Sequence, residues 1–415
     1  MRLSHRGVIA GLIAFSVGMA VVSMEGCKNP DSGKTGGATA GGEAAVRPKT
    51  TATGNAVTGN EIPVGEFASL TGSTATFGQG THNGIQLAID EANAAGGVNG
   101  KKIVLKTEDD ASKPEQAQTV VTKLCTEDKV VAVLGEVAST RSMRGGSVCQ
   151  KYGVPMITPS STNPKVTETG DCVFRVCFTD DFQAAVAAHF AFDQGFRNVA
   201  IFKDIKNDYS MGYAKNFTDE FTKLGGKVTG EQTYQQDDTD FKAQLNSLKA
   251  QNPQAVLVPG YYSEVGTIAR QAKDVGLNVP LIGGDGWDSP QLIPGAGTAL
   301  EGCFFTDHYF SVDLRNPDTK KFIDAFKARY GANPDALSAL GYDAARLLVD
   351  ALKRAKTLDG PGIREAIAST KDFPGVTGKT TIDANGNARK SALVFQIKGN
   401  SFKVFKTYTP EQIGK

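Results

Sequence analysis

The segment Val130-Val-Ala-Val-Leu-Gly-Glu-Val-Ala-Ser139 begins with five apolar residues in a row and ends at a serine. A strand with no polar position is typical of a parallel sheet that helices cover on both faces. Ser139 stands where the following helix would begin, because serine is favoured at helix starts. The segment therefore predicts one buried strand and the helix after it, in a layered α/β fold.

The same alternation of strand and helix continues in both directions. Upstream, a strand is expected at residues 62–68, an amphipathic helix at 84–95 and a strand at 102–108. Further strands are expected at residues 156–158, 198–203, 227–234, 255–258 and 281–282. This order predicts a doubly wound α/β protein.

About ten strands are too many for one ordinary sheet. The segment 173–181 interrupts their series, so we expect two sheets in two Rossmann-like lobes. Strict alternation ends after residue 316. Helices are expected from Pro317, across 337–353 and from Pro361, and strands near Thr380, Ala392 and Phe402.

The charge balance excludes one group of partners. The 415 residues include 45 Lys and Arg against 44 Asp and Glu, a net charge of +1. Such a chain offers no field that would hold a nucleic-acid backbone or an anionic membrane surface. A small solute or another protein is the expected partner.

The first 26 residues resemble an export signal, with Arg2 and Arg6 before an apolar stretch at residues 8–23. Cys27 would then be the lipidated first residue, although Met24 and Glu25 depart from the lipoprotein pattern. An uncleaved anchor or an ordinary cleaved signal are the alternatives. Each places the folded part in the periplasm or at the outer face of the cytoplasmic membrane. Residues 27–60 are rich in Gly, Ala and Thr and are expected to be a flexible linker.

Five cysteines follow Cys27, an odd number in a compartment that permits disulfides. Cys172 and Cys177 fall in one expected strand, about 16 Å apart at about 3.3 Å per residue, too far for a disulfide. Cys125 and Cys149, near the ends of successive helices, are the candidate pair. The sequence contains no CxxC motif and only four histidines, so we expect no metal site.

Several short segments stand in a fixed order along the chain. They are Ser69-Leu-Thr-Gly72, Ile89-Asp-Glu-Ala-Asn-Ala-Ala-Gly-Gly-Val-Asn-Gly100, Val133-Leu-Gly-Glu-Val-Ala-Ser139, Gly153-Val-Pro-Met-Ile-Thr-Pro-Ser-Ser-Thr162, Val173-Phe-Arg175, Gly283-Gly-Asp-Gly-Trp287 and Gly341-Tyr-Asp-Ala344. In order and spacing they resemble the periplasmic leucine/isoleucine/valine-binding protein family, the type I solute receptors of ABC importers. The resemblance spans about residue 61 to the end.

The resemblance implies a Venus-flytrap architecture, in which two lobes close over a ligand and are joined by three hinge crossings. We expect the crossings near residues 179–181, 309–312 and 377–380. Lobe 1 would comprise residues 61–180 plus 312–378, and lobe 2 residues 181–311 plus 379–415.

Ligands of open α/β sheets bind at the carboxyl ends of strands, where this chain carries hydroxyls. They are Ser139 after one apolar strand and Ser160, Ser161 and Thr162 after the next. Hydroxyls and free N–H groups at a helix start suit a carboxylate, although they could equally cap helices and turns. The resemblance implies that Ser139, Ser161 and Thr162 contact the carboxylate and ammonium groups of an amino acid.

The ammonium group of such a ligand needs a counter-charge when it leaves water. Asp285, in a glycine-rich turn after an apolar strand, is the candidate, with a plain turn residue as the alternative. Relatives that bind leucine commonly have Glu here. Four aromatic side chains that follow expected strands could form a wall of the site or merely pack the surface. They are Phe77, Tyr209, Tyr261 and Trp287.

The function expected is a solute-binding protein of an ABC importer, a monomer that delivers a branched-chain-like amino acid or a related amine or carboxylate to the permease. A sensory receptor with a separate signalling partner is the alternative. The sequence has no Gly-x-Ser-x-Gly elbow and no Walker loop, and the glycines at 78, 80 and 84 do not fit a dinucleotide fingerprint. We therefore expect neither an enzyme nor a bound cofactor.

Overall fold

The apolar segment at residues 130–134 contributes the central strand of a sheet. The computed structural model describes residues 47–308 and 317–414, which belong to one compact unit. Its first sheet has five strands in the order β2-β1-β3-β4-β5, all parallel, and β3 (Ala132–Leu134) is buried throughout. The expected parallel sheet is confirmed.

The elements follow one another in the order β1 (Glu61–Ala68), α1 (Ala75–Ala94), β2 (Lys102–Asp109), α2 (Pro114–Thr126), β3 (Ala132–Leu134), α3 (Ser139–Tyr152), β4 (Met156–Thr158), α4 (Lys165–Glu168) and β5 (Val173–Arg175). Next come α5 (Asp180–Asp193), β6 (Asn198–Asp204), α6 (Asp208–Lys223), β7 (Lys227–Tyr234), α7 (Lys242–Ala250), β8 (Ala255–Leu257), α8 (Tyr262–Asp274), β9 (Leu281–Gly283), η1 (Asp285–Trp287), α9 (Leu292–Ala296), η2 (Gly297–Leu300) and β10 (Phe304–His308). The last are α10 (Pro317–Tyr330), α11 (Ala336–Arg354), α12 (Gly360–Ala368), β11 (Phe373–Gly375), β12 (Gly378–Thr380), β13 (Ala392–Ile397), β14 (Phe402–Tyr408) and α13 (Pro410–Ile413).

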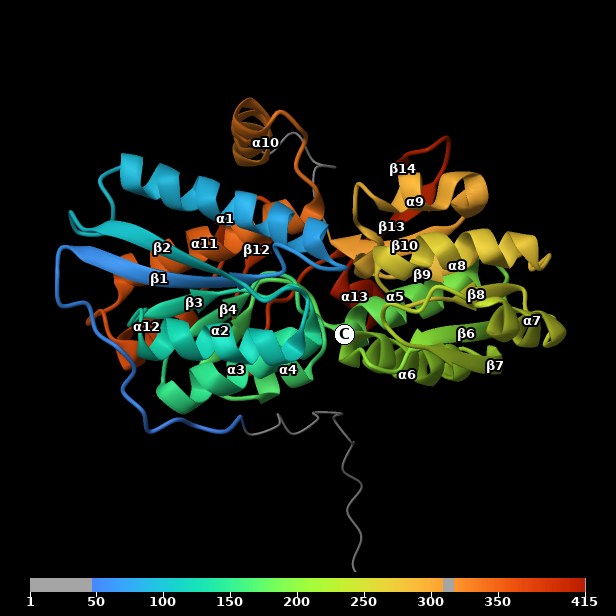
Figure 1. Cartoon of the computed structure of the whole chain (residues 1–415), viewed down its shortest axis with the longest axis horizontal. Helices are drawn as coiled ribbons and strands as arrows, with labels where there is room; N and C mark the ends of the chain where they lie inside the picture. The colour runs from blue at the N-terminus through green and yellow to red at the C-terminus, as the bar shows by residue number, and fades with distance from the viewer. Residues whose placement is uncertain (1–46, 309–316, 415) are drawn as a thin grey trace, which may run out of the picture. The chain divides into compact units, whose positions relative to one another are not determined.

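The second sheet has seven strands in the order β14-β13-β10-β9-β8-β6-β7. Its pairs are parallel from β7 to β10, whereas β13 and β14 join as antiparallel strands at one edge. Two mostly parallel sheets, each with its own helices, confirm the expected doubly wound lobes (Figure 1). A short hairpin of β11 and β12 stands apart from both sheets.

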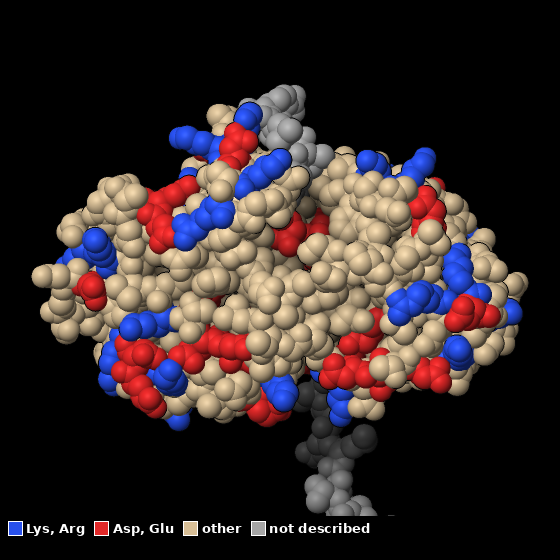
Figure 2. All heavy atoms as spheres, turned by 45° about the horizontal axis from the view of Figure 1, so that its top comes forward, with Lys and Arg blue, Asp and Glu red and all other residues tan. Residues whose placement is uncertain are grey.

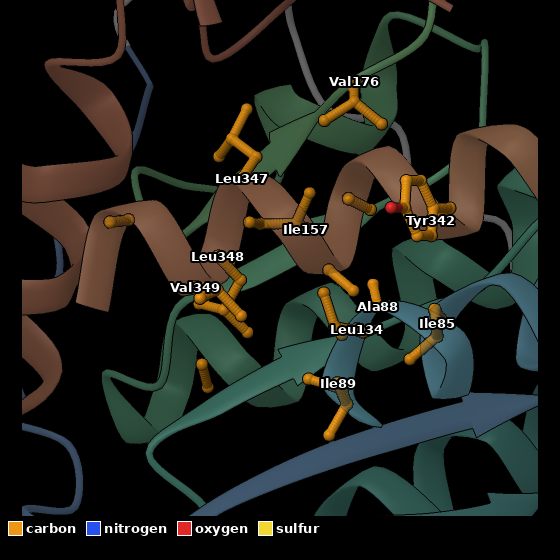
Figure 3. Packing of buried hydrophobic residues seen from close by; sticks show 14 of the residues in the cluster. Ile85, Ala88, Ile89, Leu134, Ile157, Val176, Tyr342, Leu347, Leu348 and Val349 are labelled. Carbon is orange, nitrogen blue, oxygen red and sulfur yellow. The ribbon is translucent and has the colours of Figure 1, made fainter. Parts of the chain in front are cut away.

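Helices cover both faces of each sheet, as the unbroken apolar strands require. In lobe 1, α1, α11 and α12 pack on one face and α2 and α3 on the other. Figure 3 shows Leu134 and Ile157 of the sheet in one cluster with Ile85 of α1 and Leu348 of α11. In lobe 2, α5 and α6 lie on one face and α7 and α8 on the other.

The segment at residues 47–60 corrects the expected extent of the flexible linker. Arg47 donates from Nε to the carbonyl oxygen of Thr167 at 3.0 Å. Asn55 donates from Nδ2 to the carbonyl oxygens of Cys125 and Val130, both at 2.9 Å. The segment has few apolar side chains, but its donors satisfy main-chain acceptors of lobe 1, and this orders it. The rest of the expected linker, the signal at 1–26 and Cys27 lie outside the described residues.

Two of the three expected crossings fall in described residues. Asp180 begins α5, and β12 covers residues 378–380. Ile382, just beyond, still packs in the core of lobe 1. The crossing at 309–312 lies outside the described residues, and the lobe boundaries remain a prediction. None of the helices in the described ranges is long and apolar enough to cross a bilayer.

The five cysteines of the described ranges are buried free thiols in the structure. Burial, and then a hydrogen bond with Cys125, raises the pKa of Cys149 well above its usual value. The two residues of the expected disulfide are thus neighbours, and the disulfide between them remains a prediction.

Close contact between α1 and α11 depends on a glycine. A Cβ atom at Gly84 would lie 1.9 Å from the carbonyl oxygen of Ser338. Gly84→Ala should therefore force the helices apart and lower the free energy of unfolding by about 1–3 kcal/mol or more, measured by chemical denaturation. Gly295→Ala is the matched control, because nothing lies within 4 Å of its Cβ position. Equal stability of the two variants would contradict the packing described.

Candidate functional site

The carboxyl ends of strands from both sheets border one small cavity. Ten residues line it, from the loops after β3 and β4 and the start of α11 in lobe 1, and from α6, the start of α8 and η1 in lobe 2, with one residue of α1. They are Phe77, Val137, Ser139, Ser160, Thr162, Tyr209, Tyr261, Asp285, Gly286 and Leu337. The cavity encloses about 240 Å³ of space, part of it open to solvent. Only about 10 Å³ of it is wide enough to hold water, so the lining must move apart to admit a ligand of amino-acid size.

Three of the four predicted hydroxyls face this cavity. Ser139 is the first residue of α3, and its Oγ accepts the main-chain N–H of Asn163 at 3.2 Å. Ser160 and Thr162 follow β4 and are 2% and 1% exposed. Hydroxyls at a helix start can donate to a carboxylate while the first turn of α3 adds main-chain N–H groups.

Ser161 does not line the cavity. Its Oγ lies 2.8 Å from the carbonyl oxygen of Val137 and 2.7 Å from Oγ of Ser142. The side chain therefore points back toward the loop between β3 and α3. The binding role that the sequence suggested for Ser161 is replaced by a structural one, because successive residues of this loop face opposite sides.

Asp285, the candidate for holding an ammonium group, is the first residue of η1 and is 6% exposed. Its Oδ1 accepts a hydrogen bond from Nε2 of Gln183 at 2.8 Å. Its Oδ2 lies 3.1 Å from Nε2 of His308. A carboxylate fixed through both oxygens presents its remaining lone pairs in a constant direction.

Gln183 and His308 could hardly be found from the sequence alone. Gln183 lies in the first turn of α5, just after an expected crossing, and His308 ends β10. Position at a strand end could have pointed to His308, but a lone histidine has no spacing pattern. Leu337 and Val137 were missed for a related reason, because apolar residues of a binding cavity are not distinguishable from core residues in a sequence.

Aromatic rings close the cavity on the lobe 2 side. Tyr209 and Tyr261 stack with centroids 5.5 Å apart and an interplanar angle of 6°. Phe77 from lobe 1 meets Tyr261 edge to face at 5.5 Å. With Leu337 and Val137 these rings offer an apolar surface for a ligand side chain.

Trp287 is not part of this wall, which corrects the prediction. It is fully buried, and its indole Nε1 donates to the carbonyl oxygen of Val258 at 3.0 Å. The ring packs against Phe305 in the core of lobe 2. Residues two apart in a 3₁₀ turn point about 120° apart around its axis, so Asp285 faces the cavity while Trp287 faces the core.

A buried ionic cluster supports the hydroxyl-bearing loops from behind. Nε of Arg141 on α3 lies 3.0 Å from Oε2 of Glu136, and its Nη2 donates to Oγ1 of Thr74 at 2.8 Å. Burial, and then the Glu136 carboxylate, raises the pKa of Asp110 beside them to about 7. The cluster joins the loops after β1, β2 and β3 and so fixes the position of Ser139.

Comparisons with known proteins agree with this geometry. The model of the periplasmic binding protein family matches residues 61–401. A Leu/Ile/Val-binding protein homologue of Brucella suis is 34% identical over 319 residues, 76% of this chain and 84% of that protein. A crystal structure of a leucine-binding protein from Thermotoga maritima is 38% identical, with a TM-score of 0.81, and covers 84% of this chain and 99% of that one. A branched-chain amino acid transporter substrate-binding protein from Streptococcus pneumoniae, solved with isoleucine, is 34% identical, with a TM-score of 0.79 and coverages of 84% and 100%.

Two doubly wound lobes with a small polar cavity at their strand ends define a binding protein of the type I periplasmic class. The chain belongs to the periplasmic binding protein family, a family of binding proteins and not of enzymes. The fold class and the family that the sequence predicted are both confirmed.

A buried carboxyl group, that of Asp288, connects η1 with the start of α11. Asp288 accepts the N–H of Ala336 through Oδ2 at 3.0 Å. Burial, and then the nearby Asp335 carboxylate, raises the pKa of Asp288 to about 8. The raised pKa means that ionisation of Asp288 is costly in the folded protein. The free energy of unfolding should therefore fall as the pH rises from about 4 to about 8.

Asp288→Asn should therefore unfold at a higher temperature than the native protein at pH 8, and the difference should shrink toward pH 4. Thermal denaturation followed by circular dichroism across this range provides the measurement. The exposed Asp274→Asn serves as control and should show a constant difference. A gain in stability that does not change with pH would contradict the effect of burial on Asp288.

Proposed function

We propose that this protein is the solute-binding protein of an ABC importer and that it captures a branched-chain amino acid. The observation that carries the proposal is the polarity of the cavity. Hydroxyls of Ser139, Ser160 and Thr162 lie on the lobe 1 side, and the Asp285 carboxylate lies on the lobe 2 side. A zwitterion places its acid group and its ammonium group against these two ends, which bridges the lobes.

The ligand side chain would lie against the apolar part of the lining. Phe77, Val137 and Leu337 are all less than 10% exposed and offer no charge for a polar side chain. This lining favours leucine, isoleucine or valine over amino acids with charged side chains. The relatives from Brucella, Thermotoga and Streptococcus, whose names refer to these ligands, support the same choice.

Closure of the lobes would be completed by direct contacts at the rim of the cavity. Oγ1 of Thr140 donates to Oδ2 of Asp208 at 3.0 Å, and the hydroxyls of Thr76 and Ser289 lie 2.9 Å apart. Each of these contacts joins residues of different lobes. A ligand that touches both lobes shifts the population toward this closed form, which the permease would recognise.

The formal net charge is +1, and Figure 2 shows basic and acidic side chains interspersed over much of the visible face. We propose export through the N-terminal signal and attachment through a lipid on Cys27, with the folded part in the periplasm or at the outer face of the cytoplasmic membrane. We also propose that the protein acts as a monomer and that the lobes divide at the boundaries expected from the sequence. Mass spectrometry of the mature N-terminus tests the lipid directly.

Isothermal titration calorimetry with leucine, isoleucine and valine tests the ligand class. Asp285→Asn should weaken leucine binding by about 100-fold, or about 3 kcal/mol, because the ammonium group loses its buried counter-charge. Asp274→Asn, an exposed carboxylate away from the cavity lining, should leave the affinity unchanged. Leucine binding of native strength in Asp285→Asn would show that no ammonium group binds there.

Two neighbouring serine positions provide a second test. Ser139→Ala should weaken leucine binding by about tenfold through loss of one hydrogen bond to the carboxylate, with a small change in stability. Ser161→Ala should lower the free energy of unfolding by about 1–3 kcal/mol, because it leaves buried polar partners unpaired. Calorimetry and denaturant unfolding on both variants distinguish these outcomes. Ser139→Ala with native affinity would remove Ser139 from the site.

A further inference from the structure

A histidine stands between the two polar ends of the cavity. Nε2 of His308 lies 3.1 Å from Oδ2 of Asp285 in lobe 2 and 3.4 Å from Oγ of Ser160 in lobe 1. Both partners line the cavity, and the imidazole itself is only 2% exposed. The ring therefore contacts the residue assigned to the ammonium group and one of the hydroxyls assigned to the carboxylate.

The position of the imidazole is fixed by its own surroundings. The ring stacks on Phe178, with centroids 4.0 Å apart and an interplanar angle of 25°. The main-chain N–H of His308 donates to Oδ1 of Asp307 at 2.7 Å. Stacking and strand β10 therefore hold the ring in one position beside Asp285.

The other charged groups around His308 leave Asp285 as its main electrostatic partner. Asp180, on α5, is linked to Asp285 through Gln183, whose Nε2 contacts both carboxylates. Burial, and then the charge of Asp285, raises the pKa of Asp180 well above its usual value, although Arg175 acts in the opposite direction. Burial, and then Asp288, likewise raises the pKa of Asp307. Of these three carboxylates, Asp285 is the one with an oxygen 3.1 Å from Nε2 of the imidazole.

We propose that His308 is a positioning and specificity-determining residue that sets, by its protonation state, whether the cavity selects an α-amino acid or a carboxylic acid without an amino group. With a neutral imidazole, His308 orients Asp285 and leaves its negative charge available to an ammonium group. With an imidazolium, the charge of Asp285 is already balanced and a second cation beside it is repelled. This inference rests on the proposed binding of an amino acid at Asp285.

The ligand itself does not titrate in the relevant range. A free amino acid keeps its ammonium and carboxylate charges between about pH 5.5 and pH 8, whereas histidine is the side chain that ordinarily changes charge there. A pH-dependent preference for the amino group must therefore originate in the protein. An acid that lacks the amino group should show the opposite trend, because its binding beside Asp285 improves when the aspartate is neutralised.

The test compares leucine with 4-methylpentanoate, which is leucine without its α-amino group. Calorimetry at about pH 8 and about pH 5.5 gives the ratio of the two affinities at each pH. In the native protein this preference for leucine should fall by about tenfold or more at the lower pH. In His308→Gln, which keeps a hydrogen-bond donor for Asp285 but cannot become charged, the ratio should stay constant.

His82→Gln is the matched control. His82 also pairs with a buried carboxylate, with Nδ1 2.7 Å from Oε2 of Glu66, but it does not line the cavity. This variant should keep the pH-dependent preference of the native protein. Calorimetry of leucine binding can also be repeated in buffers that differ in their enthalpy of ionisation. The measured heat should depend on the buffer for the native protein, because protons are released, and should not depend on it for His308→Gln.

The outcomes separate this inference from the proposed function. If leucine binds and His308→Gln retains the native change in preference with pH, His308 does not set the selection and the inference is wrong. A native preference that is constant with pH has the same consequence. If leucine, isoleucine and valine bind at neither pH, the proposed function is wrong, and the inference is wrong with it.

Discussion

Asp285 imposes the main constraint on this structure, because a carboxylate that is 6% exposed must be compensated. Its own lobe supplies two hydrogen-bond partners, Gln183 and His308, and no Lys or Arg among the described residues forms an ion pair with it. The facing lobe supplies hydroxyls and main-chain N–H groups, which suit an anion. The two lobes therefore offer complementary ends to one molecule that carries both charges. Their separation by a small cavity explains why such a ligand would hold them together.

The rest of lobe 1 keeps its half of this arrangement in place. The buried pair of Arg141 and Glu136 connects α3 with the loop from which α3 begins, and Ser161 fastens that loop to the one after β4. Buried charges of this kind are costly unless every partner is in position, so they leave the loops little freedom. Loops with so little freedom would allow the proposed hinge motion to assemble one defined site.

Much of the fold could be predicted because strands β3, β8 and β9 contain no polar side chain, and that pattern belongs to parallel sheets covered on both faces. The site was predictable in part, since strand ends identify the loops but not the direction of each side chain within them. Ser161 and Trp287 show the limit: each neighbours a lining residue, and each turns to a main-chain or side-chain partner on the other side. The segment at 47–60 shows another limit. Its composition suggests disorder, whereas its order comes from Arg47 and Asn55 reaching acceptors far away in the sequence.

A crystal structure of the protein with bound leucine tests the central claim most directly. The account predicts a closed form in which the leucine carboxylate contacts Ser139 and Thr162, the ammonium group contacts Asp285, and the side chain lies against Phe77 and Leu337. A leucine molecule bound elsewhere, or bound here with its ammonium group turned away from Asp285, would contradict it.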